Sequence, residues 1–351
     1  MIYFVEQYNP DMRYQTMWRD HIVPHIRNCG FDCEVVKSRD SLTIHKGLWG
    51  EFAYKNSQFD SLFELRFANK INEGDTFVFC DAWNLNALYF KLITQSYGYK
   101  VNMVGIWQQG GFDTDSQMRQ MLLKKGNTSW LKITERALSA VYDYNCFFDD
   151  INLRRFSEIN KATKEGHNKT VIGQPIGTLK QFADDTYKDK RDLIIFPYSA
   201  ESKGQREIFN AIQSDFPQWE FVFCNDHRTT RPEYIKLLSQ AKLVFGAGRA
   251  ISDPTLLFEA LLFDCNIIAP DIGTYKRLLP EEYLFPYKYL KPPTVNFMRN
   301  REPFEDLVGH LMKDYEDTRE LREATVAKLS KSHYNDQGLL YILKQVIDKD
   351  E

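Results

Sequence analysis

Short apolar runs alternate with longer segments of helical character along almost the whole chain of 351 residues. In the first half, we expect strands at 2–5, 31–36, 76–80 and 101–107, within 140–148, and at 170–174. The helices expected between them span 14–27, 61–69, 85–97, 128–139 and 151–158. Strands that alternate with helices in this way predict an α/β fold, in which helices cover both faces of a parallel sheet.

The second half repeats this pattern from 192 to about 286 and ends in helices expected at 304–312, 317–329 and 336–349. A short polar segment, 181–191, separates the two halves, and we place a hinge there. The length suits two domains. The glycine-rich fingerprint of dinucleotide-binding domains is absent, which argues against a dinucleotide-dependent oxidoreductase.

The stretch 246–275 carries the most chemical information. A preceding apolar run stops at Gly246 and Gly248, where the backbone can approach a ligand without interference from a Cβ atom. Pro254 suits the first position of a helix, and the free amides at such a helix start suit a phosphate. Glu259, about one turn further on, is placed to accept hydrogen bonds from ribose hydroxyls. A second buried strand, 266–270, follows. These features predict a pocket for a nucleotide sugar.

Three blocks of this half, 193–209, 220–245 and 256–286, resemble the donor-binding domain of GT-B glycosyltransferases. The resemblance covers roughly residues 190 to 290. It implies two Rossmann-like parallel-sheet domains that face a cleft, and a glycosyltransferase that uses a nucleotide sugar, most simply a UDP-sugar. It also implies an acceptor-binding domain over 1–185, a donor-binding domain over 186–335, and a C-terminal helix, 336–351, that packs back on the first domain.

The donor-binding residues that the resemblance and the motif indicate lie along this half. They are Lys203, Gly248, Arg249, Ser252, Thr255, Leu256, Glu259 and Tyr275. Four of them have a plainer alternative: Lys203 as a solvated lysine, Arg249 in a surface ion pair, Glu259 as a hydrogen-bonded helix acid and Tyr275 as a core residue. Retaining enzymes of this type carry a second glutamate eight positions earlier, but Ile251 stands there. The usual arginine after the first strand is also missing near Ser199, so the stereochemistry stays open.

Three aspartates of the first half are candidates for the catalytic base. Asp81 directly follows an expected strand, and its alternative role is to cap the next helix. Asp113 and Asp115 follow Gly110 and Gly111 in a loop after another strand, and their alternative is a solvated acidic turn. These positions fit the role, because ligands in open α/β sheets bind beyond the carboxyl ends of the strands. A catalytic base there could reach the hydroxyl of the acceptor that attacks the sugar.

No metal is expected. The Asp-any-Asp spacing of Asp113 and Asp115 also occurs in a metal site of the other major glycosyltransferase fold, but the Gly-Gly context differs. His21 and His25 have a zinc-compatible spacing without an evident third ligand. We find no export signal or transmembrane segment, and six cysteines without a metal-binding pattern, so we expect a cytoplasmic protein without a membrane partner.

The acceptor is the least constrained part of the prediction. The N-terminal residues 1–19 and the loop 105–113 are similar to glycosyltransferase-like proteins of tailed bacteriophages. That resemblance implies transfer onto 5-hydroxymethylcytosine in double-stranded DNA as the best hypothesis. The net charge of −3 favours instead a polysaccharide or small-molecule acceptor. A third alternative is an inactive GT-B scaffold that acts as a binding module, which the missing glutamate and arginine would explain.

Overall fold

The chain forms two units, and each is built around one parallel sheet. The computed structural model describes residues 1–6, 22–38, 48–68, 70–108, 110–113, 119, 129–160, 168–175, 177–197, 203–224, 229–246, 255–291, 295–332 and 336–348. Unit 1 comprises 1–178 and 333–351, and unit 2 comprises 179–332. The segment of the expected hinge contains the end of helix α8 (Gly177–Asp185).

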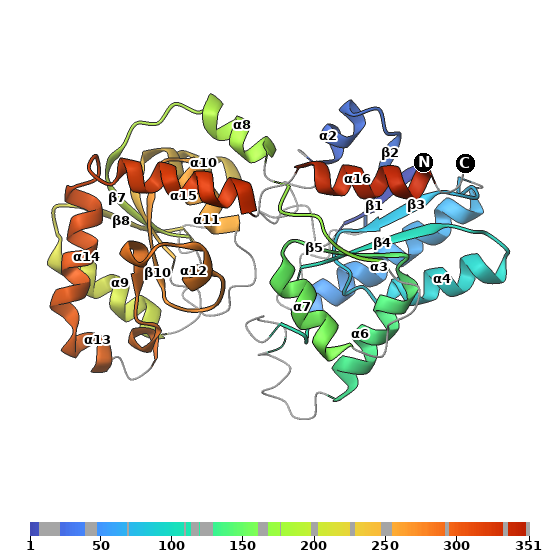
Figure 1. Ribbon diagram of the computed structural model, residues 1–351, viewed down its shortest axis with the longest axis horizontal. Helices are drawn as coiled ribbons and strands as arrows, with labels where there is room; N and C mark the ends of the chain where they lie inside the picture. The colour runs from blue at the N-terminus through green and yellow to red at the C-terminus, as the bar shows by residue number, and fades with distance from the viewer. Residues whose placement is uncertain are drawn as a thin grey trace. The chain divides into compact units, whose positions relative to one another are not determined.

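Unit 1 contains a six-stranded sheet in the order β2-β1-β3-β4-β5-β6, and every pair of neighbouring strands is parallel (Figure 1). The strands are β1 (Ile2–Val5), β2 (Cys33–Val36), β3 (Thr76–Phe79), β4 (Asn102–Trp107), β5 (Tyr144–Phe147) and β6 (Asn168–Val171). The strands β1, β3 and β5 are buried along their whole length. This explains why they are continuous apolar or aromatic runs instead of alternating patterns.

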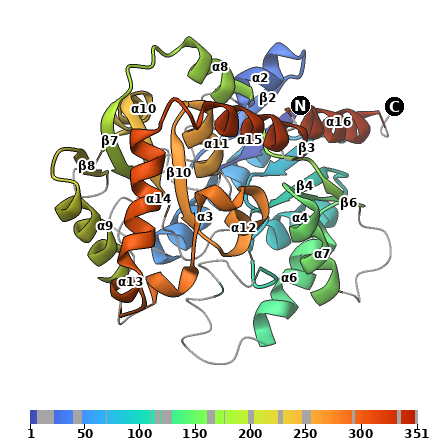
Figure 2. The ribbon, with the colours of Figure 1, turned by 60° about the vertical axis from the view of Figure 1, so that its left-hand side comes forward.

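Helices cover both faces of this sheet (Figures 1 and 2). One face is covered by α2 (Val23–Asn28) and α16 (Asp336–Ile347), whose apolar side chains share a core with β1, β3 and β4. The opposite face is covered by α3 (Leu48–Phe67), α4 (Asn86–Ser96), α6 (Ser129–Val141) and α7 (Asp150–Ile159). Asp149 caps the start of α7, because its carboxylate accepts hydrogen bonds from two backbone amides of the first turn.

Unit 2 contains a five-stranded parallel sheet in the order β11-β10-β9-β7-β8. Its strands are β7 (Arg191–Phe196), β8 (Glu220–Phe223), β9 (Ala241–Phe245), β10 (Asn266–Pro270) and β11 (Leu284–Phe285). Its longer helices are α9 (Lys203–Asp215), α10 (Arg231–Gln240), α11 (Thr255–Leu262), α14 (Arg301–Lys313) and α15 (Arg319–Ser332). Shorter ones are α12 (Gly273–Leu278) and α13 (Val295–Arg299).

Most of the sequence-based elements agree with this arrangement, and two differences concern the strands and helices of unit 1. The helix expected at 61–69 begins much earlier, at Leu48. The sequence pattern did not indicate the earlier part, because its inward side chains are polar and are buried through hydrogen bonds to other segments. The strand expected at 170–174 is Asn168–Val171, a partly exposed edge strand whose polar start concealed it. Most of the helix expected at 14–27 lies outside the described residues, which show α2 at its end.

Candidate functional site

In unit 2, the backbone after β9 lies directly against a buried tyrosine. The amide of Gly246 donates a hydrogen bond to the carbonyl oxygen of Ile268, at 2.8 Å. A Cβ atom on Gly246 would lie 3.1 Å from the hydroxyl oxygen of Tyr275, which is fully buried. This distance is tighter than ordinary packing, so glycine lets β9 end beside the Tyr275 hydroxyl. Tyr275 therefore packs at the carboxyl edge of the sheet, where the predicted donor loop begins.

Glu259 is a buried acid in an otherwise apolar helix. All residues of α11 from Leu256 to Leu261 are buried, and Glu259 itself is 6% exposed. Its Oε2 atom accepts a hydrogen bond from the hydroxyl of Tyr234 on α10, at 3.1 Å. An acid is stable in such surroundings only when it is hydrogen-bonded. The hydroxyl of Tyr234 therefore fixes the orientation of the Glu259 carboxylate in this helix.

The other predicted donor-binding residues are described only in part. Thr255 begins α11 and is half-buried, whereas Leu256 is buried in the core. Lys203 begins α9. The remaining three, Gly248, Arg249 and Ser252, lie outside the described residues, so their roles stay predictions.

In unit 1, Asp81 follows β3 and forms a buried ion pair with Lys55 of α3. The distance from Lys55 Nζ to Asp81 Oδ2 is 2.6 Å. Lys55 also donates to the carbonyl oxygen of Trp83, at 2.9 Å, and the amide of Trp83 donates to Asp81 Oδ1, at 2.9 Å. The carboxylate of Asp81 is therefore engaged by both a cation and a backbone amide. It does not cap α4, which begins without a side-chain cap.

Asp113 follows β4 at the same edge of the sheet and is also buried in an ion pair. Its Oδ1 atom lies 2.8 Å from Arg155 Nη1, and Arg155 belongs to α7. Asp81 and Asp113 thus belong to the loops that follow two neighbouring strands, β3 and β4. Asp115 lies outside the described residues. The assignment of a catalytic base among the three stays a prediction.

Glu135 of α6 connects these two loops, and sequence analysis missed it. Its Oε1 atom accepts hydrogen bonds from the indole of Trp83, at 3.1 Å, and from the amide of Gly111. A Cβ atom on Gly110 would lie 2.5 Å from the same oxygen, so glycine is required there. Burial raises the pKa of Glu135. Hydrogen bonds from Trp83 and the loop amides oppose this shift.

A second buried polar group that sequence analysis missed lies after β1. Glu6 accepts a hydrogen bond from the hydroxyl of Tyr54, at 2.6 Å, and its carbonyl oxygen accepts one from Gln58 Nε2, at 2.7 Å. Tyr54, Lys55 and Gln58 all belong to α3. The available signal was that Glu6 and Asp81 are both acids that follow buried strands directly. Within the described residues, no group of three or more His, Cys, Asp or Glu side chains is close enough to hold a metal ion.

Comparison with known proteins identifies the fold. No family model matches the chain, and no curated protein matches its sequence. Among solved structures, sucrose-phosphate synthase from Thermosynechococcus elongatus matches with a TM-score of 0.63 at 10% identity, over 98% of this chain and 97% of that one. The chain has the GT-B fold of glycosyltransferases. This result confirms the predicted fold class of two parallel-sheet α/β domains.

Two further structures with this fold cover the whole length of the chain. The lipopolysaccharide outer core galactosyltransferase WaaB matches with a TM-score of 0.54 at 8% identity, over 100% of this chain and 99% of that one. HepE from Anabaena, in complex with UDP-glucose, matches with a TM-score of 0.55 at 11% identity, over 99% and 98%. None of these names supports the resemblance to phage DNA-modifying enzymes. Every helix in the described part of the chain is too short or too polar to cross a bilayer.

Proposed function

We propose that this GT-B chain is a glycosyltransferase that moves a sugar from a UDP-linked donor to an acceptor hydroxyl. The observation that carries the proposal is the buried Glu259 of α11, which a hydrogen bond from Tyr234 orients. The sequence motif predicts that this residue accepts hydrogen bonds from the ribose. The structural neighbours support the donor class, because HepE is described with UDP-glucose bound.

In the proposed reaction, the acceptor oxygen forms a bond to the anomeric carbon while the bond from that carbon to the UDP oxygen breaks. The acceptor proton passes to a base, and negative charge develops on the departing diphosphate. Backbone amides of the loop after Gly246 and the cations Lys203 and Arg249 are proposed to stabilise that charge. Unit 2 would thus hold the donor, and the strand ends of unit 1 would present the acceptor.

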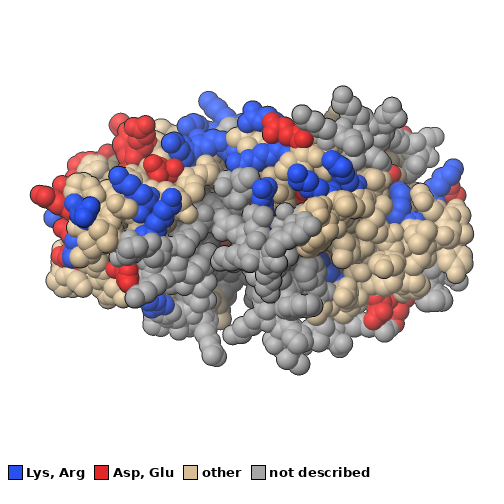
Figure 3. Space-filling view, turned by 90° about the horizontal axis from the view of Figure 1, so that it is seen from below, with Lys and Arg blue, Asp and Glu red and all other residues tan. Residues whose placement is uncertain are grey.

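A saccharide or small-molecule acceptor is favoured over DNA. Two of the neighbours are named as a sucrose-phosphate synthase and a lipopolysaccharide galactosyltransferase. A DNA acceptor carrying 5-hydroxymethylcytosine would need a basic surface to neutralise phosphates. In Figure 3, Lys and Arg side chains gather in several groups on the described surface, with Asp and Glu side chains between and beside them. With a net charge of −3, this mixture gives no particular support to a DNA-binding face.

Titration calorimetry with UDP, ADP and CDP tests the donor site. We expect UDP to bind, and Glu259→Ala to weaken its binding by about tenfold to a hundredfold, because hydrogen bonds to a charged group contribute roughly 1.5–3 kcal/mol. The matched control is Glu320→Ala, which removes an exposed glutamate of the same unit. Equal binding of UDP to both variants, or no binding of UDP to the wild type, would contradict the proposed site.

A second experiment separates the acceptor classes. The protein is incubated with a pool of UDP-sugars and either a duplex containing 5-hydroxymethylcytosine or a set of mono- and oligosaccharides, and the products are weighed by mass spectrometry. We expect a gain of one hexose or pentose on a saccharide. A gain on the DNA would establish the DNA acceptor instead. UDP binding without turnover of any donor would favour the inactive-scaffold alternative.

A further inference from the structure

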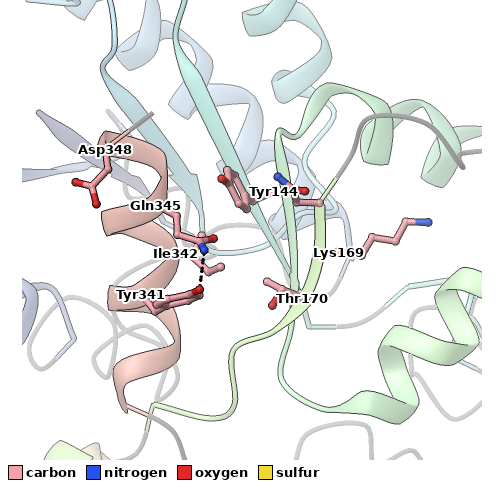
Figure 4. Close-up of a pocket in the computed structure, with 8 residues that line it drawn as sticks. Tyr144, Lys169, Thr170, Tyr341, Ile342, Gln345 and Asp348 are labelled. Carbon is pink, nitrogen blue, oxygen red and sulfur yellow. Dashed lines mark hydrogen bonds between the residues drawn. The ribbon is translucent and has the colours of Figure 1, made fainter. Parts of the chain in front are cut away.

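A pocket of about 620 Å³ lies in unit 1, at the opposite end of the sheet from Asp81 and Asp113 (Figure 4). Its walls come from α16 and from the amino ends of β5 and β6, where Tyr144 and Asn168 are the first residues of their strands. The pocket is therefore separate from the strand ends that follow β1, β3 and β4. Its volume falls in the range of pockets that hold small ligands.

Two tyrosines and two amide side chains define the chemistry of this pocket. Tyr341 of α16 is 60% exposed, whereas Tyr144 is buried. Gln345 donates a hydrogen bond from Nε2 to the hydroxyl of Tyr341, at 2.7 Å, and this bond holds the exposed ring in place (Figure 4). Asn168, the first residue of β6, adds a second amide side chain to the lining. The lining thus combines aromatic surface with groups that both donate and accept hydrogen bonds.

The pocket carries little net charge. Its charged lining residues are one cation, Lys169, and one anion, Asp348. The side chain of Lys169 points away from α16 in Figure 4, and its ammonium lies 5.7 Å from the centre of the Phe156 ring. Burial lowers the pKa of Lys169. A phosphate or a carboxylate ligand would need an excess of positive charge, and a cationic ligand would need an excess of negative charge. Neither excess is present among these residues.

We infer that this pocket binds a neutral oligosaccharide, separately from the proposed reaction site. A pyranose ring has an apolar face of C–H groups, which packs on an aromatic ring, and a rim of hydroxyls, which pair with amides. Tyr341 supplies an exposed ring, and Gln345 and Asn168 supply the amides. Such a site would hold a saccharide chain on unit 1 while one of its ends reacts elsewhere. The inference extends the proposed glycosyltransferase function but does not depend on Glu259.

Saturation-transfer NMR on the full chain tests this site with five neutral probes: maltotriose, cellotriose, chitotriose, mannotriose and galactotriose. We expect at least one to bind. Tyr341→Ala removes the exposed ring and should weaken binding about three- to tenfold, whereas Tyr341→Phe keeps the ring and should retain most of the affinity. The control, Tyr187→Ala, removes a tyrosine that is 84% exposed in unit 2 and should leave binding unchanged.

Two outcomes would overturn the inference: no binding by any of the five probes, or binding that Tyr341→Ala does not weaken. The competing ligand is an extended peptide, which could pair with the edge strand β6 through backbone hydrogen bonds. If an extended peptide bound and the sugars did not, the pocket would be a peptide site. UDP binding separates this result from the proposed function, because Tyr341→Ala should leave UDP affinity unchanged and Glu259→Ala should leave trisaccharide affinity unchanged.

Discussion

Replacing Lys55 by methionine tests whether Asp81 is held as half of a buried ion pair. The side chains of Lys55 and Asp81 are 3% and 1% exposed, and their charged atoms lie 2.6 Å apart. Methionine keeps most of the side-chain volume but removes the ammonium, so Asp81 stays buried with the amide of Trp83 as a donor. Removing one partner of a buried pair costs about 3–5 kcal/mol, and we expect the free energy of unfolding to fall by that amount.

The double variant Lys55→Met, Asp81→Asn makes the prediction specific. Asparagine can still accept the hydrogen bond from the Trp83 amide, and no uncompensated charge remains. The carbonyl of Trp83 loses its bond from Lys55, which costs about 1–3 kcal/mol. We therefore expect the double variant to be more stable than Lys55→Met alone. Urea unfolding followed by tryptophan fluorescence measures this difference, since Trp83 lies beside the pair.

Two results would refute this reasoning. One is a fall in the free energy of unfolding below about 1 kcal/mol for Lys55→Met. The other is a fall for the double variant that equals the sum of the falls for Lys55→Met and Asp81→Asn measured separately. The same proteins also test the catalytic hypothesis for Asp81. A stable double variant that still transfers sugar would exclude Asp81 as the base. A stable double variant that binds UDP but no longer transfers sugar would support that role.

Three further predictions concern the packing around unit 1. Gly110→Ala places a Cβ atom 2.5 Å from Glu135 Oε1, and we expect it to lower the free energy of unfolding in urea titrations by about 1–3 kcal/mol. In the control Gly309→Ala the added Cβ atom meets nothing within 4 Å, so the free energy of unfolding should stay the same or rise. Gly338→Ala would overlap the carbonyl oxygen of Ile172, so we expect it to displace α16 and raise amide hydrogen exchange in that helix. Because the folded-state pKa of Glu135 is raised, the folded state holds its proton more tightly than the unfolded chain does. The stability of the wild type relative to Glu135→Gln should thus be greatest below about pH 4 and fall as pH rises through the raised pKa, and parallel stability curves for the two proteins would contradict this.

The sequence predicted most of the sheet strands because their residues are buried on both sides. Ile2–Val5 is apolar or aromatic throughout, and residues 77–79 form a similar run, so their type and position could be recognised from composition alone. The first half of α3 could not be recognised in this way. Its inward side chains, Tyr54, Lys55 and Gln58, are polar and stable there only because partners from distant segments satisfy them.

In the candidate site, too, residues with a local sequence signal could be predicted, whereas contacts between distant segments could not. Glu259 could be singled out because it is the one acid within the apolar helix Thr255–Leu262. Its partner Tyr234 lies 25 residues away in the chain, and only the tertiary fold of unit 2 brings the two together. Glu135 looked like an ordinary acid of an amphipathic helix. Its contacts with Trp83 and the Gly111 amide depend on two loops whose approach no local pattern encodes.

The division of the chain into units also constrains how the protein emerges from the ribosome. Unit 1 is made of two separate pieces, 1–178 and 333–351, with all of unit 2 between them. Leu339, Leu340 and Leu343 of α16 are buried in a core with Ile2 and Phe4. During synthesis, unit 2 can complete its own sheet before α16 has left the ribosome. Until α16 is made, part of the apolar face of the unit 1 sheet stays uncovered. Premature termination before α16 would therefore expose the part of this apolar face that α2 does not cover and favour aggregation.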